Sequence, residues 1–239
     1  MCAADLEAEL SQAVSRSFAS VPGAEGICDS LLLLKGQYCW VLKVDMLVEK
    51  CGGGLVDACV MAAHAALRDC SLPAVKVVDG QNGAKELILC DEDSAEASDP
   101  FVPLISRGAE KALPLVATLL VLRVPKDLAE KIGAPEIVER DLILADPSEE
   151  ESKSSLVVGR VSAAVNAAGS VVGLDVKGVL RPDTLRRCIR AAARASQLLF
   201  AGVDSALRDE AEERERSSVL GKSARLGFVD GSIADGLNI

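Results

Sequence analysis

Hydrophobic and polar residues alternate along residues 38–49, so that every second side chain is apolar. This alternation predicts a long β-strand with one buried face and one mixed face. Residues 55–67 are apolar on nearly every side, which predicts a helix buried between layers. The glycines at 52–54 would join the two elements through a sharp reversal. The apolar face of the predicted strand consists of Trp40, Leu42, Val44, Met46 and Val48.

Helices and shorter strands are predicted around this central unit. Residues 5–18 carry apolar side chains at near-four spacing, which predicts an amphipathic helix. Pro182 is suited to the first position of a second, longer helix with one apolar line. Turn residues bound the segments between these helices. Further strands are predicted over residues 30–34, 74–78, 87–90, 113–124, 141–145, 155–165 and 171–176.

Together these elements predict a mixed α/β (α+β) protein. Residues 1–73 would hold two helices and a two-stranded hairpin, and residues 74–208 would hold more strands with one covering helix. A two-stranded sheet leaves both edges open, so the first unit is expected to be incomplete. The missing strands would come from a partner or from an N-terminal part that this chain lacks. Residues 209–239 are expected to form a charged, flexible tail.

Composition narrows the class of protein. The 26 basic and 36 acidic residues give a net charge of −10, which argues against a chain that grips nucleic acid phosphates unaided. The eight cysteines form no CxxC pair and are expected to be reduced thiols of an intracellular protein. His64, the only histidine, has no ligand spacing around it, so a core or subunit contact is expected and no metal or cofactor. Without a secretory signal or a membrane-length apolar run, a soluble protein is expected.

Three patterns suggest chemistry, and each also has a simpler structural interpretation. The glycine turn could hold a phosphate at the start of the following helix, but it lacks the Lys and Ser/Thr of a P-loop and is interpreted as a tight turn. Arg186, Arg190 and Arg194 form a basic stripe that could touch RNA or simply face water. Six acids could bind a divalent ion or lie in a solvated loop. They are Glu139, Asp141, Asp146, Glu149, Glu150 and Glu151.

The residues around the glycine turn also carry a family resemblance. Residues 39–42 read CWVL, residues 44–47 read VDML, and residues 51–58 read CGGGLVDA before an alanine-rich helix. They resemble the RNase PH-like ring subunits of the RNA exosome, most of all the ribosomal RNA-processing protein 42 type. The resemblance implies a ribosomal S5 domain 2-like first unit followed by an RNase PH C-terminal-like α/β unit. Such subunits begin with strands that this chain lacks, which implies N-terminal truncation.

The resemblance further implies that this member has no catalytic residues. Active members hold the attacking phosphate with Asp-Gly-Gly, then Thr or Ser and an Arg. They also use two acids six residues apart in the second domain, and no such pair exists within residues 144–152. Phosphorolysis is expected to fail without an anchored phosphate and an acid for the leaving oxygen. The degenerate phosphate-loop positions are Cys51, Gly52, Gly53, Gly54 and Leu55.

A structural role is therefore expected. The chain would be a non-catalytic subunit of a hetero-oligomeric exosome ring, with other RNase PH-like subunits and S1/KH cap proteins as partners and no membrane contact. The assembled complex would carry out 3′-to-5′ RNA processing and degradation, including rRNA maturation and mRNA turnover, in the nucleus, nucleolus and cytoplasm. Two alternatives stay open. An active phosphate-dependent 3′-exoribonuclease would release nucleoside diphosphates, and a free-standing S5-like RNA-binding module would bind RNA in a salt-sensitive way.

Overall fold

The structure, a computed structural model, describes residues 3–19, 29–79, 85–89, 101–105, 108–138 and 140–219. The chain forms two compact units, residues 1–200 and residues 201–239. The expected division into residues 1–73, 74–208 and 209–239 stays a prediction. Within the described part of the chain, no helix combines the length and the apolar character needed to cross a membrane.

The elements follow one another as a helical start, short hairpins, a long-stranded sheet and a long final helix. The helices are α1 (Ala3–Ala19), α3 (Leu55–Asp69), α4 (Lys126–Lys131), α5 (Glu149–Ser152) and α6 (Pro182–Val219), with 3-10 turns η1 (Ala109–Ala112) and η2 (Pro135–Ile137). The strands are β1 (Leu32–Leu34), β2 (Tyr38–Cys39), β3 (Ser71–Pro73), β4 (Val75–Asp79), β5 (Lys85–Leu89), β6 (Phe101–Pro103), β7 (Pro114–Arg123), β8 (Asp141–Ala145), β9 (Val157–Asn166) and β10 (Val171–Gly178).

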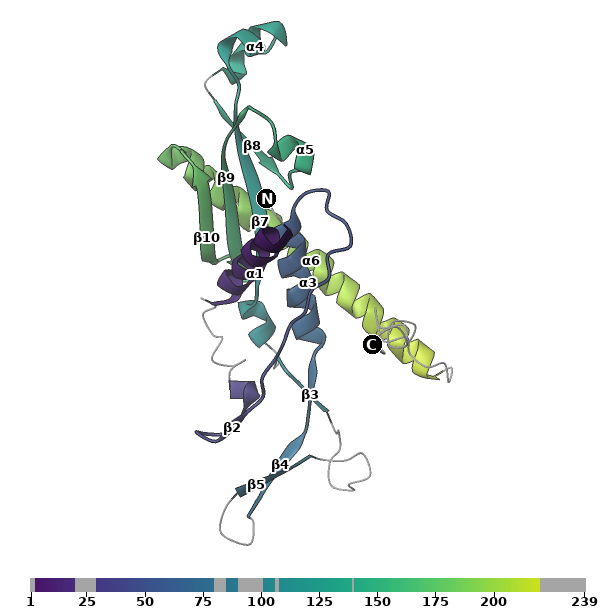
Figure 1. The fold of residues 1–239 in the computed structure, drawn as a ribbon. Coiled ribbons are helices and arrows are strands. Elements are labelled where there is room, and N and C mark those ends of the chain that lie inside the picture. Colours follow the sequence, from purple (N-terminus) through teal and green to yellow (C-terminus); the bar gives the residue numbers. More distant parts are fainter. Residues whose placement is uncertain are drawn as a thin grey trace. The chain divides into compact units, whose positions relative to one another are not determined.

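A four-stranded antiparallel sheet with the order β10-β9-β7-β8 forms the centre of the first unit. Helices α1 and α3 cover one face of this sheet, and the first half of α6 covers the other (Figure 1). Leu119 and Val121 of β7 pack with Cys188 of α6, whereas Val116 packs with Val60 of α3. Because both faces of β7 are buried, this strand carries a continuous run of apolar residues instead of an alternating pattern.

The predicted mixed α/β fold class is confirmed. Helices α1, α3 and α6 and the four long strands of the sheet lie where the sequence predicts them, within a few residues at each end. The predicted hairpin of β4 and β5 also forms. Its turn, the acidic segment 91–100 and the end of the predicted tail at residues 220–239 lie outside the described residues.

The long strand predicted over residues 38–49 is wrong in its extent. Only β2, two residues long, pairs with β1, and no residue from 41 to 50 belongs to a strand in the described structure. Trp40 and Leu42 of the predicted apolar face pack against the cluster around Leu104. The predicted burial of Val44, Met46 and Val48 is wrong, since these side chains are 44%, 38% and 42% exposed. Val41 and Leu47, on the other side, are 86% and 87% exposed. A strand needs a hydrogen-bonded neighbour, and the described residues supply none here.

The prediction that α3 is buried between two layers is also wrong. Cys59, Val60, Ala63 and His64 are buried against the sheet side, but the alanines on the opposite side are not fully covered. Alanine fits either environment, because its small side chain gains little from burial and favours the helix wherever it lies. The exposed alanines are Ala58, Ala62 and Ala66.

Candidate functional site

The glycine turn is held against a segment that lies far away in the sequence. Gly53 forms an isolated antiparallel bridge with Ser148, and the Glu149 N–H donates to the Gly52 carbonyl oxygen over 2.9 Å. Gly53 has a φ of 134°, and a Cβ at this position would lie 2.4 Å from the Pro147 carbonyl oxygen. Only glycine fits so close an approach of two backbones. The turn therefore has a structural requirement for glycine at this position.

The start of α3 offers apolar groups where a phosphate would need polar ones. Leu55 and Val56 begin the helix and pack against the cluster that contains Val14 and Val60. Gly54, the preceding residue, provides no side-chain cap. Leu55 thus occupies the position that the resemblance assigns to a phosphate-binding arginine. The assignment of residues 51–55 as a degenerate phosphate loop stays a prediction.

Asp57, in the first turn of α3, ties the helix to the sheet. Its Oδ2 accepts the Thr118 backbone N–H over 2.7 Å, and its Oδ1 accepts the Thr118 hydroxyl over 2.6 Å. The same hydroxyl lies 2.9 Å from the Ser162 Oγ. Burial raises the pKa of Asp57, although the two hydrogen bonds from Thr118 act in the opposite direction. Sequence reasoning missed this residue; its only local signal is a charged group inside an otherwise apolar helix.

We expect the Asp57→Asn variant to change the pH dependence of stability. Because the folded state raises the pKa of Asp57, the parent chain loses stability as the pH rises above 3.8, the ordinary aspartate value, through the raised value. Asparagine has no such titration, so the stability of the parent should fall relative to the variant as the pH rises. Urea unfolding of both chains between about pH 4 and about pH 7 measures this difference. A difference that stays constant across the range would contradict the expectation.

A cavity of about 300 Å³ lies beside the turn, among α1, the start of α3 and the sheet. Gly54, Leu55 and Pro147 form part of its wall. The Lys177 Nζ binds a Glu9 carboxylate oxygen across 2.6 Å, and this hydrogen bond and the lysine charge lower the pKa of Glu9. The other charged residues in the wall are Arg16, Arg160 and Asp175. The cavity is thus lined by charges of both signs.

Three of the six acids suggested as a divalent ion site, Asp141, Glu149 and Glu151, have separate partners. Ser148 and Glu151 form a capping box at the start of α5, in which each side chain accepts the backbone N–H of the other. Glu149 pairs with Lys153 over 2.5 Å. Among the described residues, no three His, Cys, Asp or Glu side chains gather as a metal site requires. Glu139 lies outside the described residues.

His64 belongs to the core of the first unit. Its Nδ1 lies 3.2 Å from the Pro114 carbonyl oxygen, and its ring meets the Phe200 ring edge-on at a centroid distance of 5.6 Å. These contacts agree with the core interpretation of this residue. The subunit contact, the other interpretation, stays untested.

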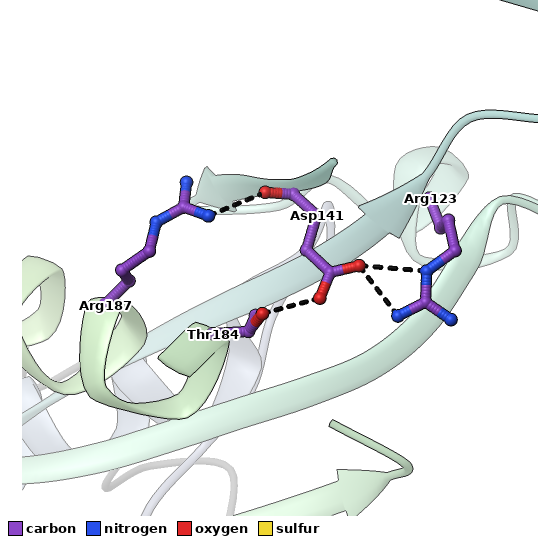
Figure 2. Close-up of polar contacts among 4 residues, drawn as sticks. All are labelled: Arg123, Asp141, Thr184 and Arg187. Atoms are coloured by element: carbon purple, nitrogen blue, oxygen red, sulfur yellow. Dashed lines mark hydrogen bonds and ion pairs between the residues drawn. The ribbon is translucent and has the colours of Figure 1, made fainter. Parts of the chain in front are cut away.

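A second polar centre surrounds Asp141 at the start of β8 (Figure 2). The Asp141 Oδ1 accepts hydrogen bonds from Arg123 Nε and Nη2 over 2.9 and 2.7 Å, and its Oδ2 accepts the Thr184 hydroxyl over 2.5 Å. Arg187 Nη1 donates to the Asp141 backbone carbonyl over 3.2 Å. Burial acts to raise the pKa of Asp141, but the hydrogen bonds from Thr184 and Arg123 outweigh it and hold the pKa below its ordinary value. Asp141 is therefore a structural acid.

The predicted basic stripe lies on the exposed side of α6. Arg186, Arg190 and Arg194 are all exposed, whereas the core-facing positions of the same helix are buried. Arg186 pairs with Asp183 over 2.7 Å, and Arg190 Nε donates to the Arg186 carbonyl oxygen over 3.3 Å. The predicted placement on the helix is correct, and contact with RNA stays a prediction.

The fold and the glycine turn can be compared with known proteins. Residues 3–73 match the family model of RNase PH, described as the 3′ exoribonuclease family, domain 1. This match covers α1, the glycine turn and α3.

Two curated relatives extend the similarity over most of the chain. Exosome complex component RRP45A of Arabidopsis thaliana is 27% identical over 213 residues, which are 84% of this chain and 59% of that protein. Exosome complex component Rrp42 of Methanothermobacter thermautotrophicus is 25% identical over 174 residues, 72% of this chain and 51% of that protein. The chain thus spans between half and three-fifths of the length of these two relatives.

Two solved structures share the fold. An archaeal exosome core superposes with a TM-score of 0.54 at 20% identity, over 85% of this chain and 66% of that one. An Archaeoglobus fulgidus exosome with RNA bound to the active site gives a TM-score of 0.50 at 21% identity, over 81% of this chain and 60% of that one. The predicted RNase PH-like fold is confirmed.

The family match over residues 3–73 and the fold shared with an archaeal exosome core make this chain similar to RNase PH-like proteins. The relatives it resembles within that class are exosome components of the Rrp42 and Rrp45 types. The predicted resemblance to an RNase PH-like exosome ring subunit of the Rrp42 type is thereby confirmed.

Proposed function

We propose that this chain is a non-catalytic structural subunit of the RNA exosome core ring. In this role it assembles with other RNase PH-like subunits and with S1/KH cap proteins. The assembled complex carries out 3′-to-5′ RNA processing and degradation, including rRNA maturation and mRNA turnover, in the nucleus, nucleolus and cytoplasm. The similarity to exosome components supports the assembly, and the chemistry of the glycine turn supports the absence of catalysis.

The observation that carries the non-catalytic role is the negative charge beside the glycine turn. The Asp146 Oδ1 lies 3.2 Å from the point that a Cβ on Gly54 would occupy, and Asp57 follows in the first turn of α3. Burial is the main cause of the raised pKa of Asp57, and the charge of Asp146 adds to it. A phosphate at this helix start would meet two acids and the apolar Leu55, although helix starts ordinarily attract anions and Arg160 lies in the same cavity wall. The two acids therefore oppose the anchoring of an attacking phosphate.

Three of the four carboxyl groups described beside the turn are held by other groups, and the fourth, Asp146, lies next to Gly54. Both oxygens of Asp57 are occupied by Thr118, and its side chain does not line the cavity beside the turn. Glu149 pairs with Lys153, and Glu151 caps the start of α5 together with Ser148. A general acid must reach the atom that it protonates, and these groups are held elsewhere.

The unpaired segment 41–50 is consistent with assembly into a ring. Its exposed apolar residues include Val41 and Leu47, and the described residues provide no strand beside it. A row of open backbone groups next to apolar side chains is the kind of surface that another strand completes. In the proposed ring, this segment would be covered.

Assembly is tested by purifying the tagged chain from its own cells and identifying the co-purifying proteins by mass. Recovery of RNase PH-like subunits together with S1/KH cap proteins is expected, and the tag alone serves as the control. Recovery of the chain by itself, with salt-sensitive RNA binding, would instead support the free-standing RNA-binding module.

We expect the purified chain to show no phosphate-dependent RNA degradation. The reason is that Leu55 stands where the resemblance places a phosphate-binding arginine, and that Asp57, Glu149 and Glu151 are held by other groups. A single-stranded RNA labelled at its 5′ end is incubated with the chain with and without inorganic phosphate, and released nucleoside diphosphates are measured. Release that requires phosphate would support the active exoribonuclease and contradict the structural role.

A further inference from the structure

A second cavity, of about 510 Å³, lies where β8 and α6 begin. Its wall contains three arginines, Arg140, Arg181 and Arg187, together with the aspartates Asp141 and Asp183. All three arginine side chains are exposed, and they come from two segments that are distant in the sequence. The fold therefore brings three arginine residues around one hollow.

Each aspartate in this wall is already paired with an arginine outside it. Asp141 accepts two hydrogen bonds from Arg123, and Asp183 pairs with Arg186 over 2.7 Å. Counted over the described wall residues and these two partners, five arginines and two carboxylates leave an excess of three positive charges. The whole chain carries a net charge of −10, so this cluster is positive within a protein that is negative overall.

We propose that Arg140, Arg181 and Arg187 form a phosphate-binding site. A guanidinium group is planar, keeps its charge and presents five N–H donors in a fork that matches phosphate oxygens. The contact of Arg187 with the Asp141 carbonyl uses one of these donors. The hydrogen bonds to Asp141 hold the start of β8 and the start of α6 together, so they keep the three arginines in one place.

The phosphate can come from an RNA backbone or from a free ion. Residues 181–194 contain five arginines and one aspartate, and the exposed stripe of Arg186, Arg190 and Arg194 leads along α6 from the cavity. A polyanion that starts in the cavity would continue along this stripe, which favours an RNA phosphodiester. The choice of RNA as the polymer rests on the proposed exosome role, whereas the phosphate site itself does not.

The first arm of the test measures binding of the purified full chain to a fluorescent single-stranded oligouridylate by anisotropy at several salt concentrations. Arg140→Gln is expected to weaken binding about 5-fold and to reduce the salt slope by about 0.7, the value for one phosphate contact with a single strand. Arg187→Gln is expected to act in the same direction. Arg208→Gln is the matched control, because Arg208 is an exposed arginine of the same helix outside the cavity. It is expected to change binding less than about 2-fold.

The second arm follows the melting temperature of each chain as inorganic phosphate is added. Free phosphate is identified as the ligand if it raises the melting temperature of the parent and of Arg208→Gln, but not that of Arg140→Gln, and if the chain does not bind RNA. RNA binding that depends on Arg140 would identify the RNA backbone.

The proposal is overturned if Arg140→Gln responds to both probes as the parent does, or if Arg208→Gln loses as much binding. Arg140 is exposed, so its variant is expected to fold, and circular dichroism verifies this. Neither arm needs a partner subunit. A negative result here therefore leaves the assembly test unaffected, and failed assembly leaves the phosphate site unaffected.

Discussion

Replacing Gly53 by alanine is expected to lower the free energy of unfolding by about 3 kcal/mol. The new Cβ would lie 2.4 Å from the Pro147 carbonyl oxygen and 2.7 Å from the Ser148 Cα, and both contacts are backbone atoms that a rotamer change cannot move. The φ of 134° adds strain for any residue with a Cβ. Chemical denaturation of the parent and the variant measures the difference.

Gly52→Ala is the matched control for this prediction. Gly52 lies in the same turn, but a Cβ there would meet no atom within 4 Å. Its substitution is expected to change stability by less than about 1 kcal/mol. Equal effects of the two substitutions would show that the turn does not rest against residues 147 and 148 as described.

Replacing Asp141 by alanine is expected to cost about 3 kcal/mol or more. The Asp141 side chain is 2% exposed, and its loss would leave Arg123 and the Thr184 hydroxyl without their acceptor. Because the folded state lowers the pKa of Asp141, the carboxylate stabilises the parent above its ordinary value of 3.8, and this stability is lost as the pH falls toward the lowered value. Urea unfolding at neutral and acidic pH measures both effects.

Asp183→Ala provides the comparison for Asp141. Asp183 also pairs with an arginine, but its side chain is 89% exposed, so its removal is expected to cost less than about 1 kcal/mol. The two substitutions therefore compare the stability cost of removing a buried acid that accepts several hydrogen bonds with that of removing an exposed acid. If Asp183→Ala were the more damaging change, the assignment of Asp141 as the structural centre would be wrong.

The sequence predicts the sheet and its helices well because their apolar patterns are local and strong. The run from Pro114 onwards can only be a strand buried on both faces or a buried helix, and its valines and neighbouring turns decide for the strand. The pattern over residues 38–49 is equally clear, yet the long strand does not form. Alternation shows which side chains could face a core, but both the strand and its buried face also depend on a partner that belongs to another segment.

The polar centres are the least predictable part of the chain. Asp141 and Asp57 look like members of an acidic loop and of a helix start, but their partners Thr184 and Thr118 lie 43 and 61 residues away. No periodicity connects such residues, because the contact exists only after the layers have packed. The glycine turn shows the same division: its reversal is evident from three glycines, but the reason that Gly53 must be glycine lies in Pro147.

The exposed segment 41–50 affects how readily the protein would be degraded or aggregate in a cell. The described residues leave Val41 and Leu47 exposed beside backbone groups that can pair with another extended chain, including a second copy. If a partner subunit covers this segment, as in the proposed ring, copies made without that partner would be targets for chaperones and proteases. The partner's supply would then set the steady amount of the protein, and raising its synthesis alone would yield aggregates.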